Sequence, residues 1–414
     1  MSVNINGVIK KIEETKTPKV NKVALAFSGG VDSSLCVELL RRKYKASEIL
    51  AFNVDVGQGD EEMTWAKEQA EKLGITLELI HAKEEFTEGW LTKAIRANSD
   101  YEGYPVSTSM TRQLIAKHVA LRAVASGCDA LMEGSSGKGN DQFRMHNVFT
   151  YFAPDLEILV PVRDFDLTRL EETELCKEWG VPVREALTGG DDKTMWCRSI
   201  ASGAIALNQE LPDDIWQWYI PPEKSSNQPT SVEIKFKEGV PVAIDGKKQP
   251  LAEIIPSLNE IGGKNSIGKI DMFEDGMMSL KSREIYEAPA AKIILALHRD
   301  LEGFCLTKEQ IHSKKEIERQ WAYMVYHGQW FHPLMDDLNA YIESSQKWVS
   351  GKYKVKLYKG AIDIVERHSD TSLFSPELRS IAATGFDQRE SRGATHITGL
   401  QYKVLRQRES KASS

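Results

Sequence analysis

This sequence of 414 residues has few cysteines, no long apolar run and no excess of positive charge. Its five cysteines include no pair at C-x-x-C spacing, so neither a disulfide framework nor a zinc ribbon is expected. No segment approaches the roughly 18 uninterrupted apolar residues of a membrane span, and the N-terminus lacks an apolar signal core. These absences predict a soluble, cytoplasmic protein without a membrane partner.

The charge balance is acidic. Lysine and arginine together number 53 and aspartate and glutamate 60, which gives a net charge of -7. That sign disfavours nucleic acid as a partner, and small anionic substrates must be bound by local positive features. The nine histidines show no metal-ligand spacing, so no protein-built metal site is expected.

From Val23 onward the sequence alternates short β-rich runs with amphipathic helical stretches. This alternation predicts an α/β fold with a doubly wound parallel sheet. The expected strands cover 23–27, 49–54, 76–81, 130–133 and 158–162. The expected helices cover 33–43, 61–73, 84–96, 110–125 and 168–179.

After residue 182 the pattern changes to hairpin-like segments and longer helices, which predicts an α+β domain. Its expected β segments are a hairpin over 232–244 and runs at 269–273 and 354–366, and its expected helices cover 288–301 and 307–326. We divide the chain into residues 1–182 with an N-terminal extension, residues 183–375, and a C-terminal helix and tail over 376–414. The stretch 220–230 is either a boundary or a long surface loop, and the last dozen residues are expected to fray.

The most specific local motif is S-G-G-V-D-S-S at 28–34, which follows the first strand and leads into a helix. Its glycines let the backbone approach phosphate oxygens, and its hydroxyls and helix N-terminal amides donate hydrogen bonds to them. Asp32 is unusual in an anion site unless a divalent cation joins it, which indicates Mg²⁺. The loop resembles that of pyrophosphatase-type ATP-binding enzymes, which cleave ATP between its α- and β-phosphates.

Three further segments suit a nucleotide and an amino acid. The second strand ends in N-V-D-V-G-Q at 53–58, where Val54 would contact adenine. An aromatic, several hydroxyls and Arg112 crowd into Y-P-V-S-T-S-M-T-R-Q at 104–113, a combination suited to holding a carboxylate. Glycines, serines and charged side chains follow the fourth strand in E-G-S-S-G-K-G-N-D-Q-F-R at 133–144.

Together these motifs resemble the argininosuccinate synthase family, over about Val23 to about Phe386. Later motifs agree in order, among them W-C-R-S-I at 196–200 and K-S-R-E-I-Y-E-A-P at 281–289. The resemblance implies ATP-dependent ligation of citrulline and aspartate to argininosuccinate through a citrullyl-adenylate, with release of AMP and pyrophosphate, in arginine biosynthesis. It also implies a homotetramer assembled through the second, synthetase domain and a C-terminal helix.

The resemblance also assigns ligands residue by residue. ATP would be bound by Ala26, Phe27, Ser28, Gly29, Gly30, Val31, Asp32, Ser33, Ser34, Val54 and Gly134. Aspartate would be bound by Ser136, Asn140 and Asp141, and the acceptor by Tyr104, Thr108, Ser109, Arg144, Ser199, Glu274 and Tyr286, with Arg112 on the same side. Asp32, Lys138 and Asp141 would act in catalysis, Lys138 as an electrostatic helper.

Departures from the family pattern cluster on the acceptor side. Gly190 stands for a serine, Thr194 for an asparagine, Ser107 and Glu284 for glycines, and Glu133 for a histidine. A paralogue that adenylates a different ureido or amide acceptor is therefore an alternative. A tRNA-modifying thiolase with the same loop is disfavoured by the acidic charge and the missing C-x-x-C, and a non-enzymatic nucleotide-binding protein would not split ATP.

Overall fold

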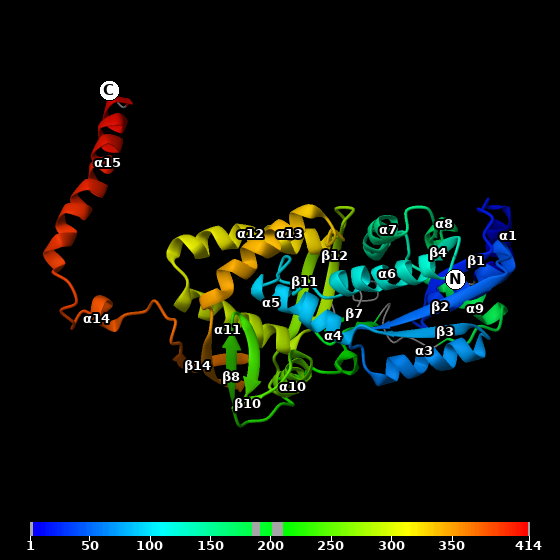
Figure 1. The fold of residues 1–414 in the computed structure, drawn as a ribbon, viewed down its shortest axis with the longest axis horizontal. Coiled ribbons are helices and arrows are strands. Elements are labelled where there is room, and N and C mark those ends of the chain that lie inside the picture. Colours follow the sequence, from blue (N-terminus) through cyan, green and yellow to red (C-terminus); the bar gives the residue numbers. More distant parts are fainter. Residues whose placement is uncertain (1–2, 184–190, 201–209, 413–414) are drawn as a thin grey trace. The chain divides into compact units, whose positions relative to one another are not determined.

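The structure is a computed structural model that describes residues 3–183, 191–200 and 210–412. Two compact units divide the chain, Met1–Thr371 and Ser372–Ser414. In the larger unit the parallel strands of the first half lie at one end and the antiparallel strands of the second half at the other (Figure 1). Among the described residues no helix is long and apolar enough to cross a membrane.

A five-stranded sheet in the order β3-β2-β1-β4-β5 forms the first half. All its pairings are parallel, between β1 (Lys22–Ala26), β2 (Glu48–Asp55), β3 (Thr76–His81), β4 (Ala130–Met132) and β5 (Glu157–Leu159). Ala24 packs into one hydrophobic cluster while its neighbours Val23 and Leu25 pack into another. Both faces of the sheet are therefore covered, as the predicted doubly wound fold requires.

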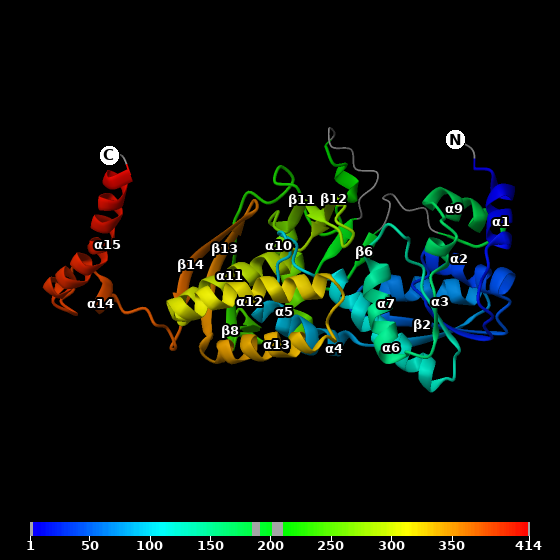
Figure 2. The ribbon, with the colours of Figure 1, turned by 90° about the horizontal axis from the view of Figure 1, so that it is seen from above.

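Helices cover the two faces. Figure 2 shows α1, α2 and α9 on one side and α6 and α7 on the other. The helices of this half are α1 (Ile5–Glu14), α2 (Val31–Leu39), α3 (Asp60–Lys72), α4 (Lys83–Glu85), α5 (Thr92–Arg96), α6 (Thr108–Ala125), α7 (Asp141–Phe152), α8 (Pro161–Asp164) and α9 (Arg169–Glu178), with π-helical turns at Leu40–Tyr44 and Phe86–Leu91.

One strand prediction was too long. We expected a strand over 158–162, but β5 ends at Leu159 and α8 begins at Pro161. Proline has no N–H to donate to a strand ladder, and its fixed φ suits the first turn of a helix.

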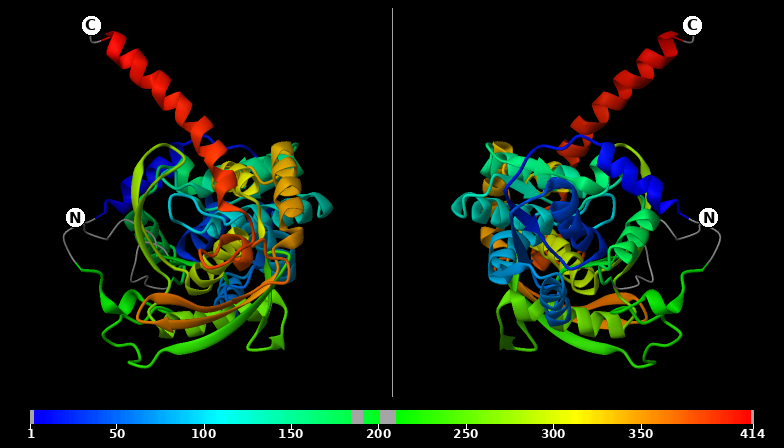
Figure 3. Two further views of the ribbon diagram at one scale, coloured as in Figure 1. Left: turned by 90° about the vertical axis from the view of Figure 1, so that its left-hand side faces the viewer. Right: turned by 90° about the vertical axis from the view of Figure 1, so that its right-hand side faces the viewer.

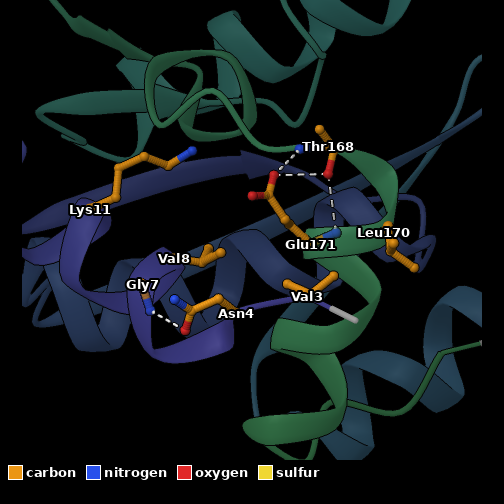
Figure 4. A pocket seen from close by; sticks show the side chains of 8 residues that line it. All are labelled: Val3, Asn4, Gly7, Val8, Lys11, Thr168, Leu170 and Glu171. Carbon is orange, nitrogen blue, oxygen red and sulfur yellow. Dashed lines mark hydrogen bonds between the residues drawn. The ribbon is translucent and has the colours of Figure 1, made fainter. Parts of the chain in front are cut away.

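The N-terminal extension folds as α1 and packs on α9. Val8 and Ile12 are buried in the cluster that includes Leu175, and the Lys11 Nζ donates to the Asp166 carbonyl at 2.8 Å. Asn4 caps α1, and Thr168 begins α9 with a reciprocal capping box (Figure 4). The surface pocket between these helix starts is lined by Val3, Asn4, Gly7, Val8, Lys11, Thr168, Leu170 and Glu171.

Truncating Ile12 to alanine should therefore destabilise the fold. Ile12 is 3% exposed, and deleting a buried isoleucine side chain costs about 2 to 5 kcal/mol through lost burial and the cavity that remains. We expect a lower urea midpoint at an unchanged m-value. Lys10→Ala, on the exposed face of the same helix, is the matched control; equal midpoints for the two variants would mean that α1 docking contributes no stability.

Two antiparallel sheets form the second half, in the orders β10-β9-β8-β13-β14 and β11-β12-β7-β6. Figure 3 shows the green and orange strands of the first of these as one curved layer. The strands are β6 (Asp191–Lys193), β7 (Arg198–Ile200), β8 (Thr230–Lys237), β9 (Val240–Ile244), β10 (Lys247–Lys248), β11 (Lys269–Asp275), β12 (Lys281–Glu287), β13 (Gly351–Tyr358) and β14 (Ala361–His368). The helices are α10 (Leu251–Lys264), α11 (Pro289–Cys305), α12 (Lys308–Tyr326) and α13 (Pro333–Ser345).

These elements confirm the α+β pattern and refine it. The run at 354–366 is a second hairpin, β13–β14, which turns at Lys359 and Gly360, both with positive φ. The stretch 220–230 is a loop without helix or strand up to Thr230, where β8 begins.

The expected helix over 84–96 is broken and belongs with the second half. Its central turn is π-helical, and α5 packs against α11 and α13. Just after α5, the Asn98 amide donates to Glu302 and to Glu318, each at 2.6 Å. A segment of the first half is thereby interlocked with the second.

In the smaller unit a short helix, α14 (Pro376–Arg379), precedes the long helix α15 (Ser391–Ala412). The expectation that the last dozen residues fray is wrong as far as Ala412, because α15 continues to that residue. Lysine, leucine, arginine, glutamine and glutamate dominate its last turns, and all of them favour helix.

Candidate active site

The loop after β1 contains a glycine with positive φ and brings two serine hydroxyls together. Gly29 adopts a φ of +77°, and a Cβ there would lie 3.0 Å from the Cα of Ala66. The Ser28 and Ser33 hydroxyls are 3.3 Å apart, and Gly30 precedes the first turn of α2. The amides of that turn and these hydroxyls can therefore face one anion.

Two of the predicted ATP ligands, Phe27 and Ser34, have buried side chains. Phe27 is buried, and its carbonyl accepts from the Asn53 amide at 2.8 Å. Ser34 is fully buried, and its hydroxyl finds no hydrogen-bond partner among the described residues. Of the remaining predicted ATP ligands, Ala26 is half-buried at the end of β1 and Val54 is buried near the end of β2.

Asp32 is held by an arginine from another helix. Arg169, at the start of α9, pairs with both carboxylate oxygens of Asp32, its Nη2 at 3.1 Å from Oδ2. Buried Glu172 lies beside them, 3.5 Å from Arg169. Burial, together with the charge of Asp32, raises the pKa of Glu172 to about 9.

Close packing joins the phosphate loop to the glycine-rich loop that follows β4. A Cβ added to Gly134 would lie 2.9 Å from the Cβ of Asp32, so only glycine fits there. The loop therefore leaves the sheet directly against the first turn of α2. Its Lys138 is exposed and its Ser136 half-buried, while Asn140 and Asp141 begin α7.

Asp141 lies between two guanidinium groups. Its Oδ2 accepts from Arg112 Nε at 2.8 Å and its Oδ1 from Arg144 Nη1 at 2.9 Å. Burial alone would raise the pKa of Asp141, but the two positive charges and their hydrogen bonds hold it below its ordinary value. Arg112 also pairs with Asp192 of β6, so it ties both halves together and is not free to take a carboxylate alone.

The aromatic residues predicted for the acceptor come together. Tyr104 and Tyr286 stack with their ring centroids 4.3 Å apart, and both are buried. Tyr286 Oη donates to Glu274 at 3.0 Å, while Tyr104 Oη accepts from the amides of Ser107 and Thr108. In the sheet, Ser199 is paired with Tyr286.

Glu274 is buried, and burial raises the pKa of its carboxyl while the hydrogen bonds from Tyr326 and Tyr286 act in the opposite direction. Ser109 also is buried, and its hydroxyl has no hydrogen-bond partner among the described residues. The site therefore combines the Asp141 carboxylate, which accepts hydrogen bonds from two arginines, with the Glu274 carboxyl, which accepts hydrogen bonds from two tyrosines.

Comparison with known proteins agrees with this geometry. Two family models match the chain, the Arginosuccinate synthase N-terminal HUP domain over residues 22–182 and the Arginosuccinate synthase C-terminal domain over residues 191–405. The chain belongs to the argininosuccinate synthase family.

Relatives of this family align over nearly the whole chain. An argininosuccinate synthase of Methanopyrus kandleri is 41% identical over 94% of this chain and 100% of its own length. That of Methanosarcina acetivorans is 42% identical over 94% of this chain and 98% of its own length. A solved U34-tRNA thiolase of Methanococcus maripaludis covers 45% of this chain and 66% of its own, at 19% identity and a TM-score of 0.30, which supports no inference.

The structure explains part of the departures from the family pattern. Ser107 and Thr194 are both buried and bond each other through their hydroxyls at 2.8 Å. Glu284 accepts from Ser282 at 2.5 Å on β12. Glu133 is buried, and burial raises the pKa of its carboxyl to about 7. Gly190 lies outside the described residues.

Three residues of this site were not predicted from the sequence. Arg169 and Glu172 lie beside the phosphate loop, and Tyr326 lies between Asn140 and Glu274. All three stand on helices far from the motifs in sequence, and no local pattern distinguishes them from helix-surface or core residues. Among the described residues no group of three or more His, Cys, Asp or Glu is arranged to hold a metal ion.

Proposed function

We propose that this chain ligates citrulline and aspartate to argininosuccinate through a citrullyl-adenylate, with ATP converted to AMP and pyrophosphate. The observation that supports this most directly is the contact between Gly134 and Asp32, which brings the phosphate loop and the amino-acid loop to one edge of the sheet. An adenylating ligase needs this proximity, because the acceptor oxygen must reach the α-phosphorus in line with the leaving pyrophosphate.

In the first step the loop residues would bind and orient ATP. The α2 amides and the Ser28 and Ser33 hydroxyls would hold the phosphates while the ureido oxygen attacks the α-phosphorus. Asp32, a carboxylate that is 34% exposed at this loop, is the residue that would hold Mg²⁺ together with phosphate oxygens. The ion would neutralise phosphate charge, and Arg169 would have to release Asp32 for it to bind.

In the second step the amine of aspartate attacks the activated carbon and AMP leaves. We assign Asp141 to the ammonium group of aspartate, beside Ser136 and Asn140. Arg144, Glu274 and Tyr286 would hold the carboxylate and ammonium of citrulline. No covalent side-chain nucleophile is needed, because AMP is a good leaving group and the protein supplies positioning and charge.

The alternative of a different ureido or amide acceptor is not favoured. Relatives at about 40% identity over more than nine tenths of the chain are argininosuccinate synthases, and two of the departures, Ser107 and Thr194, bond each other within the protein. The homotetramer, the cytoplasmic location and the domain bounds at 182 and 375 stay predictions.

The experiment that tests this proposal is product analysis with citrulline, aspartate and MgATP. Stoichiometric AMP, pyrophosphate and argininosuccinate are expected, with pyrophosphate release dependent on citrulline. ADP as the product, or ATP cleavage without argininosuccinate, would contradict the proposal.

Replacing Asp32 by asparagine should slow turnover at least about tenfold, or about 1.4 kcal/mol in barrier, because the metal loses its carboxylate. The expected loss is partly offset by raising the Mg²⁺ concentration. Asp60→Asn, on an exposed carboxylate in the first turn of α3, is the matched control. Wild-type turnover in Asp32→Asn would show that Asp32 serves only to anchor Arg169.

A further inference from the structure

The hydroxyl of Tyr326 links two residues of the proposed substrate site. Tyr326 ends α12 and is 1% exposed. Its Oη accepts from the Asn140 side-chain amide at 2.9 Å and donates to Glu274 Oε1 at 2.5 Å. The other side of the Asn140 amide group is also used, since its Oδ1 accepts from the Met277 backbone at 2.8 Å. One phenol therefore connects the glycine-rich loop of the first half to strand β11 of the second.

The ring of Tyr326 is fixed from both directions. Tyr101 stacks on it with centroids 3.8 Å apart, and the Arg144 guanidinium lies 4.8 Å from the ring centroid. Arg144 Nε also donates to the Tyr326 carbonyl at 2.9 Å. Because ring, hydroxyl and carbonyl are all engaged, Tyr326 has little freedom to place its hydroxyl elsewhere.

We propose that Tyr326 is a positioning residue of the ligase, which orients Glu274 for the acceptor's ammonium group and sets the side chain of Asn140. This inference rests on the proposed function. It adds a residue to the site from α12, a helix that none of the motifs touches.

The charge state of Glu274 depends on few neighbours. Tyr286 from β12 and Tyr326 from α12 donate to its separate carboxylate oxygens, Arg144 from α7 contributes positive charge, and Glu102 contributes negative charge. Burial raises the pKa of Glu274 and the two phenol hydrogen bonds lower it. Removing the Tyr326 hydroxyl takes away one of these donors, so the pKa of Glu274 must rise, and more of the carboxyl is protonated at a given pH.

The test is Tyr326→Phe, which keeps the stacked ring and deletes the hydroxyl. The KM for citrulline should rise about tenfold near neutral pH, and the acidic limb of kcat/KM for citrulline should move to higher pH, since Glu274 must be ionised to bind an ammonium group. The KM for ATP should stay within about twofold. Tyr323→Phe, on the exposed face of the same helix, is the matched control and should leave all three quantities unchanged.

A second variant tests the same hydrogen bond in the opposite direction, and an NMR measurement tests it without turnover. 3-Fluorotyrosine at position 326 is a stronger donor and should move the acidic limb to lower pH. Carboxyl NMR, with Glu274→Gln for assignment, should show a higher pKa of Glu274 in Tyr326→Phe. An unmoved pKa and pH profile in both variants would overturn the positioning role. Absence of argininosuccinate in the wild type would overturn the proposed function, and the carboxyl NMR would still test whether Tyr326 sets the pKa of Glu274.

Discussion

Asp141→Ala is expected to lower kcat/KM for aspartate at least about a hundredfold, or about 2.7 kcal/mol in barrier. The Asp141 carboxylate accepts from Arg112 at 2.8 Å and from Arg144 at 2.9 Å, and charge-assisted hydrogen bonds contribute about 1.5 to 3 kcal/mol each. Without it the proposed aspartate ammonium has no counter-charge, and two guanidinium groups lose a partner. Steady-state kinetics with each substrate varied in turn would measure the effect.

Comparing the effects of Asp141→Ala on aspartate and on ATP shows whether the carboxylate binds aspartate or only supports the fold of the loop. The KM for ATP should change little, because the phosphate loop has its own hydrogen bonds at Ser28 and Ser33. Asp155→Ala, on an exposed acid that follows α7, is the control for general loss of charge in this region. Equal losses for ATP and aspartate in Asp141→Ala would mean that the carboxylate only supports the loop.

Glu287→Ala is expected to destabilise the protein by about 3 to 5 kcal/mol, because it strands a buried guanidinium. Arg198 Nη1 donates to Glu287 at 2.6 Å, and their side chains are 4% and 0% exposed. Glu287 Oε1 also accepts from the backbone amides of Gln217, Trp218 and Tyr219 at 3.0, 2.7 and 2.7 Å. Chemical denaturation with a constant m-value would give the change in unfolding free energy.

A double-mutant cycle separates the ion pair from its surroundings. Glu287→Gln keeps an acceptor for the backbone amides and should cost less than Glu287→Ala. Arg198→Met combined with Glu287→Leu removes both charges and should be less destabilising than Glu287→Ala alone. Arg198→Met and Glu287→Leu are also measured singly. If the stability lost in the double variant equals the sum of these two single losses, the buried charges do not interact as the structure indicates.

The ion pair between Arg198 and Glu287 also shows that a sequence motif does not separate structural residues from ligand-binding ones. The sequence run W-C-R-S-I contains Arg198 and Ser199 side by side, and alternation along a strand sends their side chains to opposite faces. Arg198 is buried under the sheet with Glu287, while Ser199 is paired with Tyr286. Motif matching selects both residues, but only packing separates the structural one from the candidate ligand.

The sequence alone was sufficient for the parallel sheet and the family, while phosphate binding by the loop at 28–34 stays a prediction. Strand β3 matches its predicted bounds at 76–81, and the motif at 28–34 follows β1 and runs into the first turn of α2 as expected. Periodicity, glycine conformation and helix N-terminal chemistry act over a few neighbouring residues, so their consequences can be derived without tertiary contacts.

Tertiary structure decided what those local patterns could not. Arg169 meets Asp32 across 137 positions of chain, Tyr326 meets Asn140 across 186, and the helix expected over 84–96 packs into the second half. Such pairings depend on which helix faces lie against which loops after the two halves interlock. Because a buried charge or phenol gains its partner only when distant segments pack, the partner of Asp32 and the neighbours of Glu274 are properties of the fold and not of the local sequence.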